Sequence, residues 1–148
     1  MLSFRCVSFQ ELTGEELYAI LALRAAVFVV EQDCCYQDVD GKDQEGLHLM
    51  GKIDNVLVAY ARILPKGISY ADALSIGRVV THSSYRGKGY GHQLVEEALN
   101  ESKRRFPNQR IKISAQAHFE QFYTQHQFIS TGEYYLEDGI PHLAMQRD

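Results

Sequence analysis

Three glycines at alternate positions stand between a strand-like and a helix-like run in the middle of the chain. They belong to the segment Arg86-Gly-Lys-Gly-Tyr-Gly91, which follows the apolar run Ile76–Thr81. Glycines permit positive φ and close backbone approach, so successive N–H groups can point into one concavity. The positive end of the next helix and the charges of Arg86 and Lys88 favour an anion. The segment therefore predicts a phosphate or pyrophosphate site, the alternative being a tight turn whose glycines only relieve strain.

Two common nucleotide-binding patterns do not fit these glycines. The Walker pattern needs Gly five residues before a Gly-Lys-Ser/Thr triplet, and Gly87-Lys88-Gly89 supplies neither part. The dinucleotide fingerprint needs its third glycine one residue later than Gly91. No acidic residue ends the next predicted strand, where it would hold a ribose. Both nucleotide interpretations are therefore excluded by spacing.

The pattern Arg86-x-x-Gly89-x-Gly91 resembles the acetyl-CoA pyrophosphate loop of the GNAT superfamily of N-acetyltransferases. The segment Gln116–Phe128 resembles that superfamily's late strand–helix element. Further segments are similar to the ElaA-type subfamily over nearly the whole chain, namely Leu23–Gln32, Tyr36–Gly41, Ile76–Val80, Ala115–His118 and Glu137–His142. The departures are Gln116 where the superfamily usually has Asn, Gln127 where it has Gly, and Cys35 where the subfamily often has Pro.

The resemblance implies which residues hold acetyl-CoA. The pyrophosphate would be bound by Arg86, Gly87, Lys88, Gly89, Tyr90 and Gly91. The main chain of Val79 and Val80 would contact the pantetheine arm and the thioester carbonyl. A main-chain N–H there would donate to the oxyanion and stabilise the transition state by on the order of 3 kcal/mol. Gln116 stands where the pantetheine arm is contacted. The alternative for Val79 and Val80 is an ordinary buried strand.

Tyr123 matches the superfamily's general acid, the phenol that protonates the CoA thiolate as it leaves. The alternative is a core aromatic, because Phe119, Phe122 and Phe128 surround it in the sequence. The group that removes the proton of the attacking ammonium stays open. The candidates are Glu31 after the first long helix, His118 beside Tyr123, His142 in the last hairpin, or a water chain, and each side chain could instead be structural or surface.

The charges divide unevenly along the chain. The net charge is −4, from 15 Lys+Arg against 19 Asp+Glu, which argues against a general nucleic-acid binder. Residues 78–112 nevertheless hold eight basic and three acidic residues, which suits an anionic cofactor. The loop from Asp33 to Glu45 is acidic. We expect its carboxylates to be solvated, although they could also attract a cationic amine; they are Asp33, Asp38, Asp40, Asp43 and Glu45.

The length of 148 residues predicts one domain over residues 1–148. The longest apolar run, Ala25–Val30, is too short for a membrane span, and the N-terminus lacks the apolar region of a signal peptide. Three cysteines, two of them adjacent at Cys34 and Cys35, do not suit a disulfide framework and indicate a reducing cytoplasm. No His or Cys spacing typical of a metal site occurs, so no metal is expected.

Apolar periodicity predicts the elements that must position these residues. Strands are expected over Leu2–Phe9, Leu47–Ile53, Val56–Leu64, Leu74–Thr81, Arg110–Ala115, Ile129–Leu136 and His142–Gln146. Helices are expected from a capping box at Thr13 to Phe28, from Tyr90 to near Pro107, and from Phe119 to Phe128. This order predicts an α/β (α+β) fold, and the resemblance implies a GNAT-like mixed, mostly antiparallel sheet flanked by helices.

The resemblance implies an acetyl-CoA-dependent N-acetyltransferase. An acetyl group would move to a primary amine by direct attack in a ternary complex, because no nucleophile suited to an acyl-enzyme stands out. The alternatives are a non-catalytic acyl-CoA-binding or regulatory module, transfer of another acyl group, and transfer to a protein amine. The expected partners are acetyl-CoA and an amine, with no nucleic acid or membrane. Dimers are common in the superfamily, so a homodimer is also among the expectations.

Overall fold

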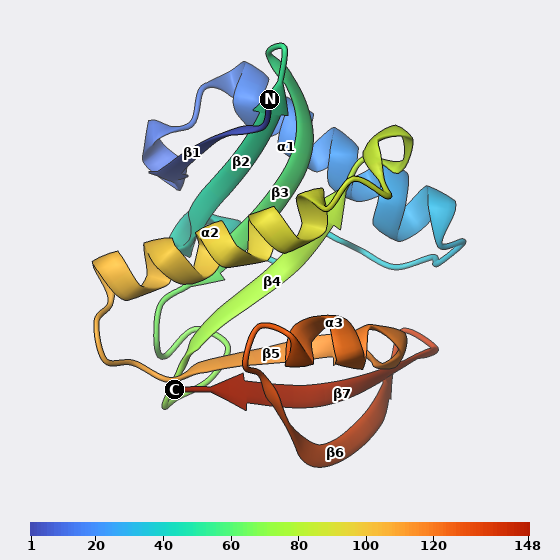
Figure 1. The fold of residues 1–148 in the computed structure, drawn as a ribbon. Helices are drawn as coiled ribbons and strands as arrows, with labels where there is room; N and C mark the ends of the chain where they lie inside the picture. The colour runs from blue at the N-terminus through green and yellow to red at the C-terminus, as the bar shows by residue number, and fades with distance from the viewer.

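A computed structural model describes residues 1–148 and contains one seven-stranded sheet in the order β1-β2-β3-β4-β5-β7-β6 (Figure 1). Neighbouring strands are antiparallel except for β4 and β5, which are parallel. The expected mixed, mostly antiparallel sheet flanked by helices is confirmed. The strands are β1 (Ser3–Ser8), β2 (Leu47–Ile53), β3 (Val56–Leu64), β4 (Leu74–Thr81), β5 (Ile111–Gln116), β6 (Ile129–Glu137) and β7 (Ile140–Arg147).

Three α-helices connect these strands. They are α1 (Gly14–Arg24), α2 (Tyr90–Arg105) and α3 (Glu120–Thr124). The predicted capping box is confirmed, because the Thr13 hydroxyl accepts from the Glu16 amide at 3.0 Å and the Glu16 carboxylate accepts from the Thr13 amide at 2.9 Å. After α1 the chain continues as a π-helical segment, Ala25–Glu31, so the first long helix changes its pitch where a uniform α-helix was expected.

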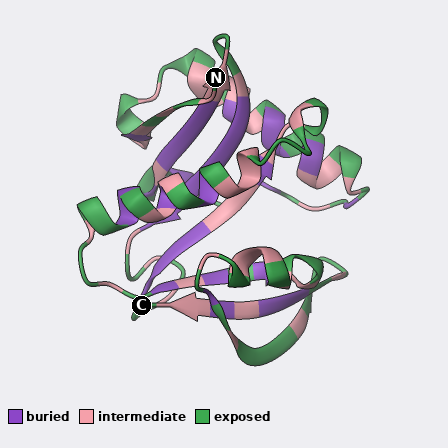
Figure 2. Ribbon diagram, in the orientation of Figure 1, coloured by how far each residue is buried: buried purple, intermediate pink, exposed green.

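Alternate residues of the central strands pack against helices on opposite faces of the sheet. Figure 1 shows α2 in front of the sheet and α1 behind it. One apolar cluster contains the buried face of α2 and, from β2 and β3, the side chains of Leu49, Ala59, Ala61 and Ile63. The other contains the buried face of α1 and the intervening residues Met50 and Tyr60. The central strands are therefore buried on both faces, whereas β6 at the sheet edge is largely exposed (Figure 2).

Two tight hairpin turns have the conformation that their residues favour. Asp54 and Asn55 join β2 to β3 with φ of +48° and +68°. Asp138 and Gly139 join β6 to β7 with φ of +51° and +78°. Positive φ at both central positions gives a turn whose twist matches that of the flanking strands. The predicted hairpins are confirmed, and the second turn comprises two residues instead of the three from Glu137 to Gly139.

Strand β4 carries a bulge in its middle that was not predicted. Between its register pairs with β3 at Gly77 and Val80, two residues of β4, Arg78 and Val79, stand opposite one residue of β3, Ala61. Arg78 has a φ of +50°, in the left-handed region that few residues other than glycine adopt. A bulge bends its strand and re-aims the residues around it.

Strands β4 and β5 separate soon after they meet. They pair only as Leu74 with Ile111 and Ser75 with Lys112, although both strands continue well beyond these pairs. Figure 1 shows the two strands diverging from this junction. The edge of β4 that faces β5 is therefore without a strand partner from Ile76 onward, and its main-chain groups are free for other contacts.

The predicted late helix is shorter than the expected Phe119–Phe128. A 3-10 turn over Ala117–Phe119 precedes α3, and the helix ends before Gln127. Gln127 has a φ of +71°, the left-handed conformation that usually ends a helix at glycine. The chain therefore makes the usual helix-ending turn with a residue less suited to it. None of the helices combines the length and apolarity needed to cross a bilayer.

Candidate active site

A cleft of about 1120 Å³ opens where β4 and β5 diverge. Its walls come from the π-helical segment, from β4 between Ser75 and Thr81, from the end of β5 with α3, and from the β6–β7 hairpin. Most of the residues expected to do chemistry line it, namely Glu31, Val79, Val80, Arg86, Gly91, Gln116, His118, Tyr123 and His142. The divergence of two strands thus brings together residues that are distant in the sequence.

The glycine loop has the predicted backbone form. Gly87 and Gly89 both have a φ of +80°, and Gly89 is the N-cap of α2. The first main-chain hydrogen bond of the helix runs from the Gln93 amide to the Gly89 carbonyl at 3.1 Å, so the three amides before Gln93 have no acceptor in the protein. Free amides at the positive end of a 16-residue helix are suited to an anion.

The side chain of Arg86 is engaged by Glu31. The two groups form a two-pronged ion pair, and Arg86 Nη2 also donates to the Thr81 carbonyl at 3.0 Å. Both side chains are about two-fifths exposed, at 40% and 42%. The hydrogen bonds from Arg86 hold the pKa of Glu31 below its ordinary value. Two residues that were assigned separate roles therefore touch, and Glu31 is a weaker base than an unpaired carboxylate.

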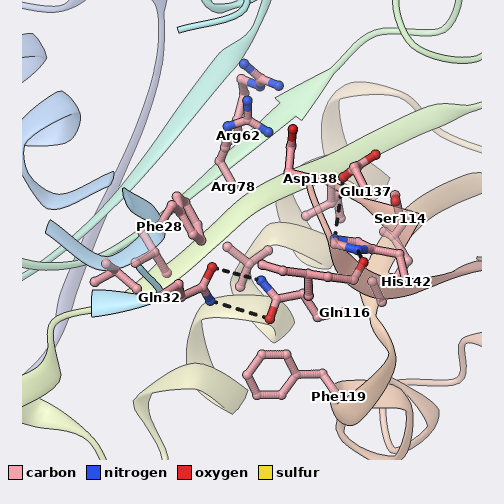
Figure 3. A pocket seen from close by; sticks show the side chains of 18 of the residues that line it. Phe28, Gln32, Arg62, Arg78, Ser114, Gln116, Phe119, Glu137, Asp138 and His142 are labelled. Atoms are coloured by element: carbon pink, nitrogen blue, oxygen red, sulfur yellow. Dashed lines mark hydrogen bonds and ion pairs between the residues drawn. The ribbon is translucent and has the colours of Figure 1, made fainter. Parts of the chain in front are cut away.

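Gln116 meets a residue that the sequence did not single out. Its amide and that of Gln32 exchange two hydrogen bonds, at 3.3 and 3.4 Å, across the cleft (Figure 3). Gln32 follows the π-helical segment, and Gln116 ends β5. The amide pair therefore joins the two walls at a place where the main chains are not paired.

Tyr123 lies on α3 with its ring against the core beneath α2. Its ring stands edge-on to those of Phe122 and Phe128, with centroids 5.0 and 5.9 Å away. Burial raises the pKa of the phenol, so it stays protonated at neutral pH. Tyr123 therefore packs as a core aromatic and also lines the cleft.

His142 is the most buried of the three base candidates, with its side chain 9% exposed. Its Nδ1 lies 2.7 Å from the carbonyl oxygen of Ile140, so Nδ1 carries a hydrogen, and in the neutral ring the lone pair is on Nε2. A carboxylate oxygen of Glu137 lies 3.4 Å from Nε2 (Figure 3). His118 differs, since it is exposed and lies against the ring of Phe119 at a centroid distance of 4.1 Å.

The expectation of a solvated acidic loop is wrong for three of its five carboxylates. Asp38, Asp40 and Asp43 pair with three arginines in an arginine–aspartate cluster. Its arginines are Arg24 at the end of α1, Arg62 on β3 and Arg78 in the bulge of β4. Arg24 is fully buried and binds Asp38 and Asp43 at 2.7 Å each. The cluster is internally neutral, so these acids are not available to attract an amine.

Hydrogen bonding and charge set the protonation of this cluster. Burial alone would raise the pKa of Asp40, but hydrogen bonds from Arg62 and its charge outweigh burial and hold the pKa well below its ordinary value. Burial likewise opposes the hydrogen bonds from Arg24 and Arg62 at Asp43, whose pKa is also lowered. The carboxylates therefore stay ionised, as a buried arginine requires.

The sequence held a signal for this cluster. Arg24 interrupts the apolar run Leu21–Val30, and Arg62 interrupts the apolar strand β3. An arginine inside a buried apolar pattern must be paired, and the nearest surplus of carboxylates is the Asp33–Glu45 loop. No comparable signal marks Gln32 or Glu137, because nothing in their spacing indicates contact with Gln116 or His142.

The residues present fit an acyl-CoA. The free helix amides, Lys88 and Arg86 suit a pyrophosphate, and the unpaired edge of β4 suits an extended amide-bearing arm. An added Cβ at Gly87 or Gly89 would meet no atom within 4 Å, so glycine is needed there for its φ and not for space. No group of three or more His, Cys, Asp or Glu side chains is placed to hold a metal ion.

Comparison with known proteins agrees with the fold and the cleft. The profile of the family described as an acetyltransferase (GNAT) domain matches residues 10–148. The chain is 43% identical to the protein ElaA of Escherichia coli over 150 residues, covering 100% of this chain and 97% of ElaA. A crystal structure of an acyl-CoA N-acyltransferase from Pseudomonas aeruginosa superposes with a TM-score of 0.93 at 44% identity, covering 100% of both chains. The crystal structure of E. coli ElaA gives a TM-score of 0.93 at 41% identity, with the same coverage.

Proposed function

Because the chain belongs to the GNAT acetyltransferase family, we propose that it acetylates a primary amine with acetyl-CoA, by direct attack while both substrates are bound. The observation that carries the proposal is the cleft at the β4–β5 divergence. The two ends of the glycine loop, Arg86 and Gly91, line this cavity together with Tyr123 and His142, which come from two other segments of the chain. An anion site can hold the acyl donor, a protonated phenol can donate to the leaving thiolate, and an imidazole can accept the proton of the ammonium.

The glycine loop and β4 would hold the acyl donor. Lys88, the free amides of α2 and Arg86, once it leaves Glu31, would bind the pyrophosphate. The main chain of Val79 and Val80 would contact the pantetheine arm and the thioester, with Gln116 nearby. Acyl-CoA supplies an activated carbonyl there, and a main-chain N–H directed at its oxygen stabilises the charge that develops.

We propose Tyr123 as the general acid. Its buried phenol keeps its proton at neutral pH, and it lines the cleft without an acceptor in the protein. A CoA thiolate that leaves beside Tyr123 can take the proton of the phenol. The phenol is protonated at neutral pH and so does not itself act as a base. Replacement of Tyr123 by Phe keeps the packing with Phe122 and Phe128 and removes only the donor.

We propose His142 as the general base. The Ile140 carbonyl fixes its tautomer, so Nε2 can accept a proton from the ammonium and leave the neutral amine to attack. The imidazolium that forms lies beside the carboxylate of Glu137, which stabilises it. Glu31 is less suited because its pKa is lowered by Arg86, and His118 because no hydrogen bond orients its exposed ring.

The reaction is tested by a screen for acetyl-CoA-dependent thiol release over a broad panel of amines, including peptides with free N-termini and lysines. We expect at least one small amine to accelerate release in proportion to acetylated product. If CoA binds with no amine accelerating release, the protein is an acyl-CoA-binding module instead of an enzyme. If only peptides react, the acceptor is a protein amine.

The residue roles are tested with the amine that the screen identifies. Tyr123→Phe and His142→Gln should each lower kcat by roughly 10²-fold or more while the affinity for CoA changes little. Glu31→Gln and His118→Gln serve as matched controls for the base and should retain most of the turnover. Unchanged turnover in His142→Gln would remove His142 from the base role.

A further inference from the structure

We propose that Asp38 and Arg78 form a positioning pair that holds β4 in its bulged path and thereby directs Val79 and Val80. Neither residue would touch the reacting atoms, so both are positioning residues. The inference rests on the proposed function, because Val79 and Val80 matter through the acyl donor that they would bind. Its structural part concerns only the path of β4 in the free protein.

The bulge decides which face of the sheet each valine occupies. Leu74 and Ile76 belong to the cluster beneath α2. In an unbroken strand Val80, which is also even-numbered, would point to the same side. Instead Val79 packs against the α2 cluster, and Val80 belongs to the α1 cluster. The extra residue at the bulge therefore reverses the alternation, and its loss would exchange the two valines between the faces.

The bulge depends on a conformation that arginine does not favour. Arg78 has a φ of +50°, which is unfavourable for a side chain with a Cβ and persists only where surrounding contacts impose it. Gly77 immediately precedes it and has no positive φ, so the strain falls on the arginine. Something in the structure must therefore hold Arg78 in place.

The contacts of Arg78 all lead to the Asp33–Glu45 loop. Arg78 Nε lies 2.7 Å from Asp38 Oδ1, and Nη2 donates to the Asp38 carbonyl at 2.8 Å. A weaker contact reaches Asp40 at 3.4 Å. The guanidinium also lies 5.9 Å from the ring centroid of Tyr36, whose hydroxyl donates to Asp38 at 2.8 Å. Asp38 is thus the main anchor, through both its side chain and its main chain.

Asp38 is in turn held from the other side by Arg24. Arg24 Nε binds its carboxylate at 2.7 Å, and Nη2 donates to its carbonyl at 3.1 Å. Arg24 is completely buried at the end of α1. Asp38 therefore joins a fixed helix end to the strained strand, and Asp43 offers a matched contrast because it binds Arg24 and Arg62 without touching Arg78.

The first test compares Arg78→Gly with Arg78→Ala. Both variants lose the same ion pair, but only glycine adopts a φ of +50° without strain. We expect the amide NMR shifts of Val79 and Val80 in the ligand-free Gly variant to stay close to those of the wild type, and its CoA affinity by calorimetry to stay within about threefold. In the Ala variant the shifts should move and the affinity should fall about tenfold.

The second test compares Asp38→Asn with Asp43→Asn. Both remove a carboxylate from Arg24, so both should lower stability. Measured where both are folded, only Asp38→Asn should move the two valine amides and weaken CoA binding. This effect should be suppressed when Asp38→Asn is combined with Arg78→Gly, because the glycine no longer needs an anchor.

The outcomes separate this inference from the proposed function. Failure of the wild type to bind CoA would overturn the proposed function. The NMR spectra of the ligand-free variants would still test the positioning pair in that case. The positioning pair is overturned if the Gly and Ala variants give the same spectra, or if Asp38→Asn and Asp43→Asn perturb Val79 and Val80 equally.

Discussion

Two groups of charged side chains border the cleft, and they are built in opposite ways. The arginine–aspartate cluster extends from the fully buried Arg24 to the partly exposed side chains of Arg78 and Asp40, and each of its three arginines contacts two of its three aspartates. The glycine loop places Arg86 and Lys88 at the surface, where Glu31 is the one carboxylate that contacts Arg86. The first group is internally neutral, whereas the second has an excess of positive charge and free main-chain amides left for an anion.

This difference follows from the dielectric surroundings. Inside the protein an unpaired charge is very unfavourable, so a buried group of charges is stable only when each charge is paired with an opposite one. At the surface water screens each charge, and an excess is tolerated. The cluster can therefore hold main chain in place, and the loop can exchange one anion for another.

The largest effect is expected from Arg24→Ala. It leaves Asp38 and Asp43 short of a partner in the interior, so the free energy of unfolding should fall by about 3–5 kcal/mol in urea titrations. Arg5→Ala is the control, because Arg5 is 51% exposed and pairs with Glu16 at the surface. It should change stability by less than about 1 kcal/mol. Equal losses would contradict the distinction between buried and surface ion pairs.

The next largest effect on the free energy of unfolding should come from low pH, through the same arginine–aspartate cluster. The folded-state pKa of Asp40 and of Asp43 lies below the value in the unfolded chain. Their stabilisation is thus present above about pH 4 and is lost as pH falls toward the folded-state pKa. Each carboxylate should give a slope of ~1.4 kcal/mol per pH unit below about pH 4. Urea titrations between pH 7 and pH 3 should show a shallower slope in Asp43→Asn.

A smaller effect is expected at the glycine loop from Arg86→Ala. Stability should change by less than about 1 kcal/mol, because the side chain is exposed, while CoA affinity should fall about tenfold with a weaker salt dependence. Lys103→Ala is the matched control, since it removes a positive charge from the exposed face of α2 outside the cleft. If both variants lose affinity alike, only the general charge of the segment matters.

The smallest effect should come from Glu31→Gln. Removing the carboxylate frees Arg86 for an anion, so CoA binding should tighten about threefold at low salt and by less at high salt. Calorimetry at two salt concentrations measures this. Weaker binding would show instead that Glu31 holds Arg86 in its binding position.

Patterns that depend on neighbouring residues were predictable from the sequence. The Asp54-Asn55 turn, the Thr13 capping box and the strand before the glycine loop each follow from local preferences, and each is present. The glycine loop was predictable because glycine adopts positive φ without a steric cost. The sheet type followed from the order of the elements and from the resemblance.

Features set by tertiary contacts were not predictable in the same way. The bulge at Arg78 lies within a regular apolar pattern, and it exists because of Asp38, 40 residues away in the sequence. The short α3 ends at Gln127, whose left-handed conformation runs against its own preference. The contact between Gln32 and Gln116 depends on how the π-helical segment approaches β5, and that between Glu137 and His142 depends on how the side chains lie across the β6–β7 turn.

The two residue pairs that join β4 to β5 divide the sheet into halves that are each continuous in the chain. Strands β1–β4 form one half and β5–β7 the other, and the apolar cluster beneath α2 spans the boundary. Each half is assembled mainly from hairpins, whereas the boundary needs distant segments to dock. A molecule bound in the cleft touches both halves and binds only when they are docked. Its binding free energy therefore stabilises the docked arrangement of the two halves relative to the separated one.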